Sequence, residues 1–403
     1  MLFDVVVGFF LIVIICCLIN RFVKNPAGSL LNPLFYLLLF SSLYLLLPLL
    51  YIDFILEVAD WDVSKETISK CYFWSLWYVG IFFVAYVSSR DGEYYFSSNK
   101  PSVSVVNMSK IVYVILTLLI IYIVCAYAPT IYSLRSDRGL ALQIYESSVN
   151  GKFKLRILTY CHLMSMLVLF WRYRSYLYLL PIIGYLLIDY SHGGRTVSLM
   201  VILFAYIIMV LNTRKTYINL ALCAVVAFII SGVLQRSASS NFIWTLYMSA
   251  AEFSNTYLTS IFLLGHPDFS YDGLAYMAVS LSKVLPGGFV DRLLEFGEWY
   301  GNFLSNDIGH AYGLAGNLLT EALVYGGKFF ALINPLLIAS ICYILNAMRC
   351  KRVLSGCIFV LMLCISMQNI VRSYFWGFLL YPVQFLLFYL FWLIPDYRKK
   401  IFL

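Results

Sequence analysis

Long apolar runs alternate with short polar segments over most of this 403-residue chain. An apolar run of about 20 residues is long enough to cross a bilayer as a helix. A helix also satisfies every backbone polar group inside lipid. By this criterion we expect about eleven membrane spans. They are residues 4–20, 31–52, 71–88, 111–128, 157–171, 176–190, 197–211, 217–234, 328–346, 353–368 and 375–394. The pattern predicts an all-α, polytopic integral membrane protein in which residues 1–403 form a single membrane domain.

The basic residues gather in alternate loops, and this distribution predicts the sidedness of the chain. The clusters are Arg21/Lys24, Arg90/Lys100/Lys110, Arg172/Arg174, Arg214/Lys215, Arg349/Lys351/Arg352 and Arg398/Lys399/Lys400. Because short loops rich in Lys and Arg stay in the cytoplasm, we expect the carboxyl terminus inside and the amino terminus outside. The net charge of +8 is then a consequence of topology, and we expect the lipid bilayer, not nucleic acid, as its partner.

The opposite side carries the longest polar interval, residues 235–327, which precedes the last three spans. It contains an amphipathic stretch, Phe242–Leu264, which we expect to lie along the membrane interface. It closes with N-D-I-G-H-A-Y-G-L-A-G-N-L-L-T-E-A-L-V-Y-G-G, residues 306–327, which holds His310, Glu321 and several glycines. Titratable groups and tight turns at the lipid boundary suit chemistry at a membrane surface better than they suit a plain anchor.

Arginine is unexpectedly frequent on the predicted outer side, where basic residues are generally scarce. The set is Arg135, Arg138, Arg195, Arg236 and Arg372. For each residue alone, contact with lipid headgroups or snorkelling is as good an explanation as a bound ligand. Together they favour an anionic ligand, because guanidinium holds phosphate oxygens in a bidentate fork.

The sequence S-H-G-G-R-T places His192 and two glycines directly before Arg195. Gly193 and Gly194 would let the backbone approach a ligand closely, and His192 could contact its phosphate. A tight turn between two helices is an equally good explanation of the glycines.

His310 is a candidate catalytic base, because imidazole titrates near neutrality and can accept a proton from a sugar hydroxyl. A loop histidine that only makes hydrogen bonds is the alternative. Glu321 is a second candidate, because an acid at a membrane edge is costly unless it is paired or functional. It would lie about three helical turns after His310 if the segment were one helix, and Lys328 is its alternative partner. An acid of the outer loop 53–70 remains a rival base.

We expect neither a metal ion nor another cofactor. The histidines do not show the H-E-x-x-H spacing of a zinc site. The ten cysteines lie in or beside apolar runs without a Cys-x-x-Cys pattern. The pair Asp60 and Asp62 spells D-x-D, but two acids at that spacing arise easily by chance.

The predicted spans, the long outer loop, the outward arginines and the segment G-H-x-x-G-x-x-G-N-x-x-x-E-A-x-x-x-G-G together resemble the O-antigen polymerase family. These are Wzy-type oligosaccharide repeat-unit polymerases, related to the O-antigen ligases. The resemblance implies a GT-C-like membrane fold with the active site on the periplasmic face of the inner membrane. It implies metal-independent transfer from an undecaprenyl-pyrophosphate-linked oligosaccharide, with a chain-length regulator as a partner protein. By position, Arg195, Arg236 and His310 look like the ligases' diphosphate-binding and acceptor-side residues. The Arg-x10-Gly spacing associated with some polymerases is absent here.

Two other functions fit the same sequence features. An O-antigen ligase would move finished glycan onto lipid A-core, and a flippase would transport the lipid-linked unit. Transporters of that kind usually show internal repeats, and the sequence shows none.

Overall fold

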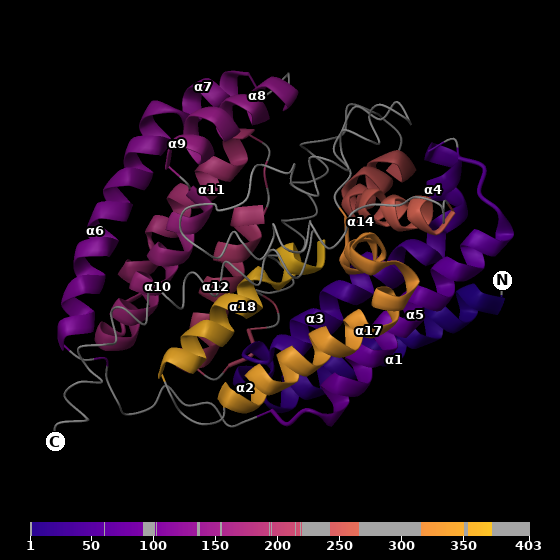
Figure 1. The fold of residues 1–403 in the computed structure, drawn as a ribbon. Coiled ribbons are helices and arrows are strands. Elements are labelled where there is room, and N and C mark those ends of the chain that lie inside the picture. The colour runs from indigo at the N-terminus through magenta and orange to yellow at the C-terminus, as the bar shows by residue number, and fades with distance from the viewer. Residues whose placement is uncertain are drawn as a thin grey trace. The chain divides into compact units, whose positions relative to one another are not determined.

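The computed structural model describes residues 2–59, 61–91, 101, 103–134, 138–153, 155–192, 194, 196–213, 215–217, 219, 242–265, 316–349 and 354–372. Every secondary-structure element in these ranges is helical, as predicted (Figure 1). Five of the described helices are long and apolar enough to cross a membrane. Helices occupy the predicted spans, apart from 217–234 and 375–394, which lie almost entirely outside the described residues.

The chain divides into two compact units by the contacts within it, and the single membrane domain stays a prediction. Unit 1 comprises residues 1–93, 232–351 and 366–383, and unit 2 comprises residues 94–231, 352–365 and 384–403. Each unit is described by itself below.

Unit 1 begins with a group of helices that pack around a buried central segment. In chain order they are α1 (Leu2–Lys24), α2 (Pro26–Leu30), α3 (Pro33–Ser41), the π-helical turn η1 (Ser42–Leu46), the 3-10 turn η2 (Leu47–Tyr51), α4 (Ile52–Ala59) and α5 (Lys65–Ser88). The segment 33–57 is the most deeply buried of the five candidate spans. Its helical pitch changes next to Pro48, which has no N–H to donate within a helix.

Helix α1 has one apolar face that is exposed and another that is buried. Large apolar side chains on α1 remain exposed, among them Phe9, Ile12 and Ile19, whereas Val7, Ile14 and Leu18 are buried. An apolar face of this kind is what a helix presents to lipid tails, so the exposed side chains of α1 are compatible with a membrane protein.

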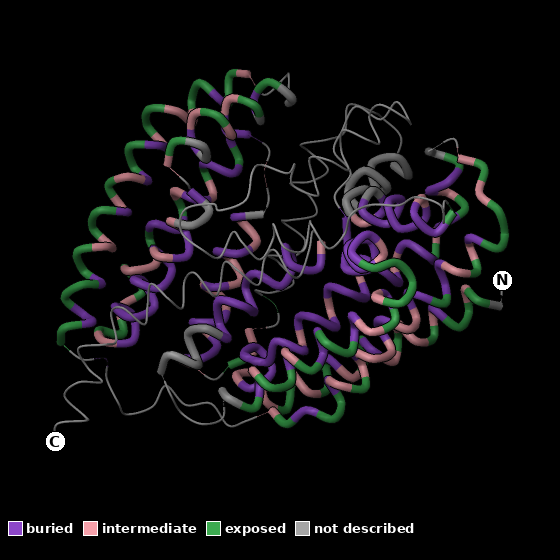
Figure 2. Tube along the Cα trace, viewed as in Figure 1, coloured by how far each residue is buried: buried purple, intermediate pink, exposed green. Residues whose placement is uncertain are grey.

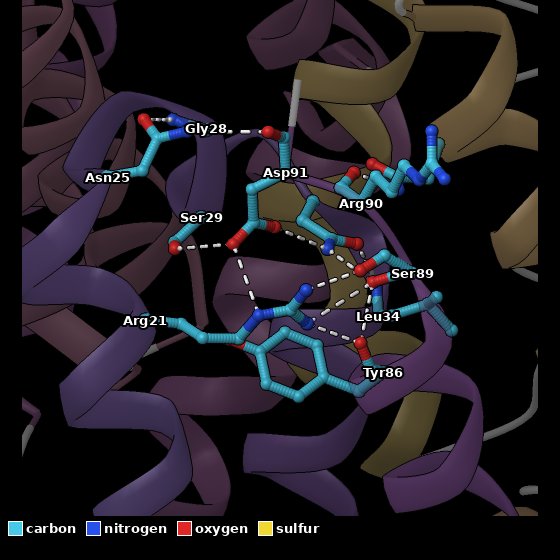
Figure 3. Close-up of polar contacts among 11 residues, drawn as sticks. Arg21, Asn25, Gly28, Ser29, Leu34, Tyr86, Ser89, Arg90 and Asp91 are labelled. Carbon is cyan, nitrogen blue, oxygen red and sulfur yellow. Dashed lines mark hydrogen bonds and ion pairs between the residues drawn. The ribbon is translucent and has the colours of Figure 1, made fainter. Parts of the chain in front are cut away.

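Two of the predicted cytoplasmic loops meet at one end of unit 1, around a group that we call the Arg21 cluster: Arg21, Asn32, Tyr86, Ser89 and Asp91 (Figure 3). The Arg21 guanidinium donates to the carbonyl oxygens of Tyr86 and Ser89, and its Nε lies 3.4 Å from Asp91 Oδ2. Asn32 Nδ2 donates to Ser89 Oγ at 3.1 Å and to Asp91 Oδ1 at 3.0 Å.

A third helix end reaches the same place, because Asn346 Nδ2 donates to the carbonyl oxygen of Arg90 at 3.1 Å. At the opposite end of unit 1, the Tyr72 hydroxyl donates to Asp4. The positions near Arg21, Arg90 and Arg349 therefore share one end of unit 1, as their charge pattern predicted.

The helix α17 (Leu318–Arg349) is interrupted at Gly326 and Gly327. Gly327 has φ 60° and ψ −153°, a backbone conformation open to glycine but strained for other residues. The interruption separates a short arm, residues 318–325, from a long arm, residues 328–349. Figure 2 shows the short arm buried and the turn that follows it exposed.

The short arm folds back beside the long arm. Asn334 Nδ2 lies 3.4 Å from the carbonyl oxygen of Leu318, although the two positions are 16 residues apart. A continuous α-helix would hold them about 24 Å apart. Residues 316–325 are buried almost throughout, so the short arm is surrounded by protein, unlike α1. The predicted span 328–346 matches the long arm alone.

The helix α14 (Phe242–Gly265) contacts α5, η1 and α17. Its second half is buried on almost every face, from Ser254 to Leu264. The predicted helix in this stretch is confirmed, and its position along the interface stays a prediction. The last described element is α18 (Leu354–Arg372), of which residues 354–365 belong to unit 2 and residues 366–372 to unit 1. In its unit 1 part, Gln368 donates to the Tyr44 hydroxyl at 2.9 Å.

Unit 2 is also helical wherever it is described. Its elements are α6 (Val103–Ala126), α7 (Ala128–Ser133), α8 (Arg138–Ile144), η3 (Tyr145–Asn150), α9 (Gly151–Phe153), α10 (Leu155–Tyr173), η4 (Tyr176–Leu179), α11 (Pro181–His192) and α12 (Thr196–Thr213). The long helices α6 and α10 pack together through Val105, Val106, Val168 and Leu169. Helix α11 packs against α6 and α12.

Candidate functional site

Glu321 lies on the short arm of α17 and is completely buried. The arm begins at Leu318 because Asn317 caps it, with Asn317 Oδ1 accepting hydrogen bonds from the backbone N–H groups of Leu319 and Thr320, each at 3.0 Å. Glu321 is therefore in the first turn of a helix, where the helix dipole favours a carboxylate.

This cap corrects one expectation. A single helix linking His310 to Glu321 would have to pass through Gly316 and Asn317, which are not helical. The spacing of about three helical turns therefore does not apply.

Hydroxyl and amide groups join the short arm to α14, and we call this group the polar seam: Thr256, Thr259, Ser260, Asn317 and Thr320. Asn317 Nδ2 donates to the Thr256 carbonyl oxygen at 3.0 Å and to Ser260 Oγ at 2.9 Å. The hydroxyls of Thr259 and Thr320 lie 2.8 Å apart. All five residues are buried, so the seam fixes the start of the short arm inside the protein.

Helix α5 supports the same region from another side. The hydroxyl of Tyr78 lies 3.4 Å from Asn334 Nδ2, and Tyr78 is fully buried. The Tyr257 hydroxyl of α14 lies 2.8 Å from Ser75 Oγ and donates to the Cys71 carbonyl oxygen at 3.2 Å. These buried contacts tie α5, α14 and α17 together around the short arm.

Lys328, the alternative partner of Glu321, does not share its buried environment. Lys328 is exposed on the far side of the glycine turn, whereas Glu321 is fully buried. The structure therefore gives no support to a Glu321–Lys328 pair as the reason for the acid.

Unit 2 contains a second buried acid, Asp189, one turn before the end of α11. Its Oδ2 accepts a hydrogen bond from the backbone N–H of Ser198 in α12 at 2.6 Å. Its backbone carbonyl oxygen accepts one from the N–H of Gly194 at 2.9 Å. One aspartate thus anchors both the end of α11 and the first turn of α12.

His192 lies beside this acid and is itself buried. Its Nδ1 donates to the Ile188 carbonyl oxygen at 2.9 Å, and its Nε2 lies 3.9 Å from Asp189 Oδ1. The imidazole stacks on the Tyr145 ring, with centroids 3.8 Å apart and planes 9° apart. A Cβ atom added to Gly194 would lie only 2.2 Å from Nε2, so the glycine is required for this packing.

The other predicted site residues are described only in part. Arg372 is half-buried in the last turn of α18, where a cation also suits the helix dipole. Arg138 begins α8, and its side chain is not described. His310, Arg135, Arg195 and Arg236 lie outside the described residues, and their roles stay predictions. In the described parts of the chain, no cluster of three or more His, Cys, Asp or Glu residues could hold a metal ion.

Three residues of these sites were missed from the sequence: Asn317, Asn334 and Asp189. Asn317 follows a glycine and precedes an apolar run, which is a signal for a helix start. Asp189 interrupts the apolar run L-L-I-D-Y-S, and an acid within a predicted span is itself a signal for a functional group. Asn334 carries no comparable signal, because its role depends on the folded-back arm.

Comparisons with family models, with curated proteins and with solved structures give no match for this chain. Its class therefore rests on the structure: an all-helical protein with several helices suited to a membrane, and with buried acids in both units.

Proposed function

We propose that this protein is a membrane glycosyltransferase that polymerises undecaprenyl-pyrophosphate-linked oligosaccharide units on the periplasmic face of the inner membrane. The observation that carries the proposal is the complete burial of Glu321 on a short arm enclosed by α5, α14 and α17. An acid buried inside a helix bundle suited to a membrane is costly unless it is paired or functional, and its burial therefore supports a functional role. It also lies in the segment, residues 306–327, that resembles the O-antigen polymerases.

The proposed reaction divides the work between two sets of residues. The acceptor hydroxyl oxygen forms a bond to the anomeric carbon of the donor sugar while the bond from that carbon to the diphosphate breaks. The diphosphate leaves with the electron pair, and Arg135, Arg138, Arg195, Arg236 and Arg372, with His192, would stabilise its charge. His310 would take the hydroxyl proton, and Glu321 is the second group able to accept it. No nucleotide is required, because the lipid-linked donor is already activated.

A flippase for the same lipid-linked unit is a second candidate, favoured by one observation. The short arm of α17 is a half-helix that starts inside the protein at Asn317 and ends at the glycine turn. Interrupted helices of this kind form the substrate sites of many transporters. The polymerase proposal is preferred because of the outer-side arginines and the long polar interval, which transport does not need.

Deletion of the gene separates these functions when the surface lipopolysaccharide is run on a gel. A strain that lacks a polymerase retains core carrying a single repeat unit, whereas loss of a ligase or a flippase leaves bare core. A bare-core result would contradict the polymerase proposal. Complementation with His310→Ala and with Arg195→Ala then tests the site, because a normal ladder from both variants would remove these residue assignments.

A further inference from the structure

The backbone between α11 and α12 is bonded to Asp189 at two described positions, Gly194 and Ser198. The backbone carbonyl oxygen of Asp189 receives the N–H of Gly194, and its carboxylate receives the N–H of Ser198. Arg195, a predicted ligand of the diphosphate, lies between these two anchored positions in the sequence. A shift of Asp189 would therefore release the backbone on both sides of that arginine.

The two carboxylate oxygens of Asp189 have different neighbours. Oδ2 caps α12 through Ser198 at 2.6 Å, whereas Oδ1 faces His192 Nε2 at 3.9 Å. The aspartate is 2% exposed, so its charge acts at close range with little screening by solvent. The position of the imidazole is further fixed by the Ile188 carbonyl oxygen and by the Tyr145 ring.

We infer that Asp189 is a positioning residue for diphosphate binding: it holds His192 and the following glycine turn in the arrangement that the lipid-linked diphosphate requires. This inference rests on the proposed function, and it deepens that function by adding a residue that acts through His192. A purely structural residue would cap α12 and nothing more. The two roles can be separated, because Oδ2 accepts the Ser198 N–H whereas Oδ1 lies 3.9 Å from His192 Nε2.

The first test uses Asp189→Asn, which keeps an oxygen able to accept the Ser198 N–H but removes the negative charge near His192. The variant is purified in detergent, and its affinity for undecaprenyl diphosphate is measured together with its melting temperature. We expect a near-normal melting temperature and an affinity about tenfold weaker, the loss expected when one charge-assisted contact is removed. Unchanged affinity in a folded Asp189→Asn protein would overturn the inference.

A double-mutant cycle asks whether Asp189 acts through His192. His192→Asn retains a nitrogen donor near the position of Nδ1 and removes Nε2. If Asp189 positions His192, the double variant binds undecaprenyl diphosphate as weakly as His192→Asn alone. Losses that multiply would show an independent role in capping α12 and would contradict the inference.

Gly194→Ala provides a second route if Asp189→Asn does not fold. The added Cβ would lie 2.2 Å from His192 Nε2, so it displaces the ring and leaves the Asp189 carboxylate in place. We expect the same loss of affinity, again without a further effect in the His192→Asn background. Normal affinity in this variant would contradict the inference.

Ser64→Ala is the matched control, because it removes the Thr67 N–H cap of α5 in unit 1 and should leave affinity unchanged. Failure of the proposed function is recognised separately. It would appear as bare core in the deletion strain, whatever the Asp189 variants do.

Discussion

The side-chain amide of Asn334 contacts the carbonyl oxygen of Leu318, 3.4 Å away and 16 residues earlier in the same element. This contact shows that α17 reverses direction at its glycines and brings Glu321 inside the protein instead of extending it along a straight span. The predictions below test this arrangement, the chemistry assigned to Glu321 and the Arg21 cluster.

The glycine turn should not tolerate a side chain. Gly327 has φ 60° and ψ −153°, a region that is almost restricted to glycine and costs other residues about 1–3 kcal/mol. We expect Gly327→Ala to lower the melting temperature of the purified protein and to shorten the polysaccharide ladder. Gly80→Ala is the control, because a Cβ there meets no atom within 4 Å and alanine favours helix. Equal melting temperatures for the two variants would contradict the assigned turn.

Loss of the Asn334 amide should loosen the short arm. Asn334→Ala removes its contacts with Tyr78 and with the Leu318 carbonyl oxygen, and leaving buried polar groups unpaired costs about 1–3 kcal/mol. We expect a lower melting temperature and faster proteolysis within residues 318–325. The control is Leu337→Ala, a change at an exposed position of the long arm, on which Asn334 also lies. If both variants melted alike, Asn334 would not hold the arm.

Glu321→Gln should weaken the ladder while the protein remains at normal abundance in the membrane. Glutamine keeps the shape of glutamate but cannot accept the proton that the proposed reaction releases. Lys328→Gln is the informative companion, because the exposed lysine is expected to be dispensable. The same defect in both variants would favour a Glu321–Lys328 ion pair over a catalytic acid, and a normal ladder from Glu321→Gln would remove its assignment.

The Arg21 cluster should require arginine in particular. The guanidinium reaches two backbone carbonyl oxygens and Asp91 at once and lies 4.6 Å from the centre of the Tyr86 ring. Lysine has no planar fork with which to make these contacts together. We expect Arg21→Lys to lower the melting temperature almost as much as Arg21→Ala, and Lys24→Ala to have little effect. If Arg21→Lys kept the full melting temperature, a positive charge without the guanidinium fork would be enough to stabilise the Arg21 cluster.

The sequence predicts the helices well because lipid imposes a simple requirement. A run such as residues 4–20 must be helical to satisfy its own backbone. The grouping of Arg21, Arg90 and Arg349 at one end follows equally from charge in alternate loops. These features depend on local sequence, and the structure confirms them within unit 1.

The features that the sequence did not predict are tertiary. The glycines of residues 306–327 predict tight turns, but the direction of the turn at Gly326 and Gly327 depends on Asn334 and on the polar seam. The role of Asp189 depends on a backbone N–H nine residues later. Contacts of this kind follow from packing and not from periodicity.

The distances along the chain within the Arg21 cluster have a consequence for biogenesis. The partners of Arg21 lie 65 and 68 residues later, so they leave the ribosome only after the next two spans have been made. We expect the contacts of Arg21 to form only after the third predicted span has been synthesised. Until then, the first helix lacks the hydrogen bonds that fix its position in unit 1.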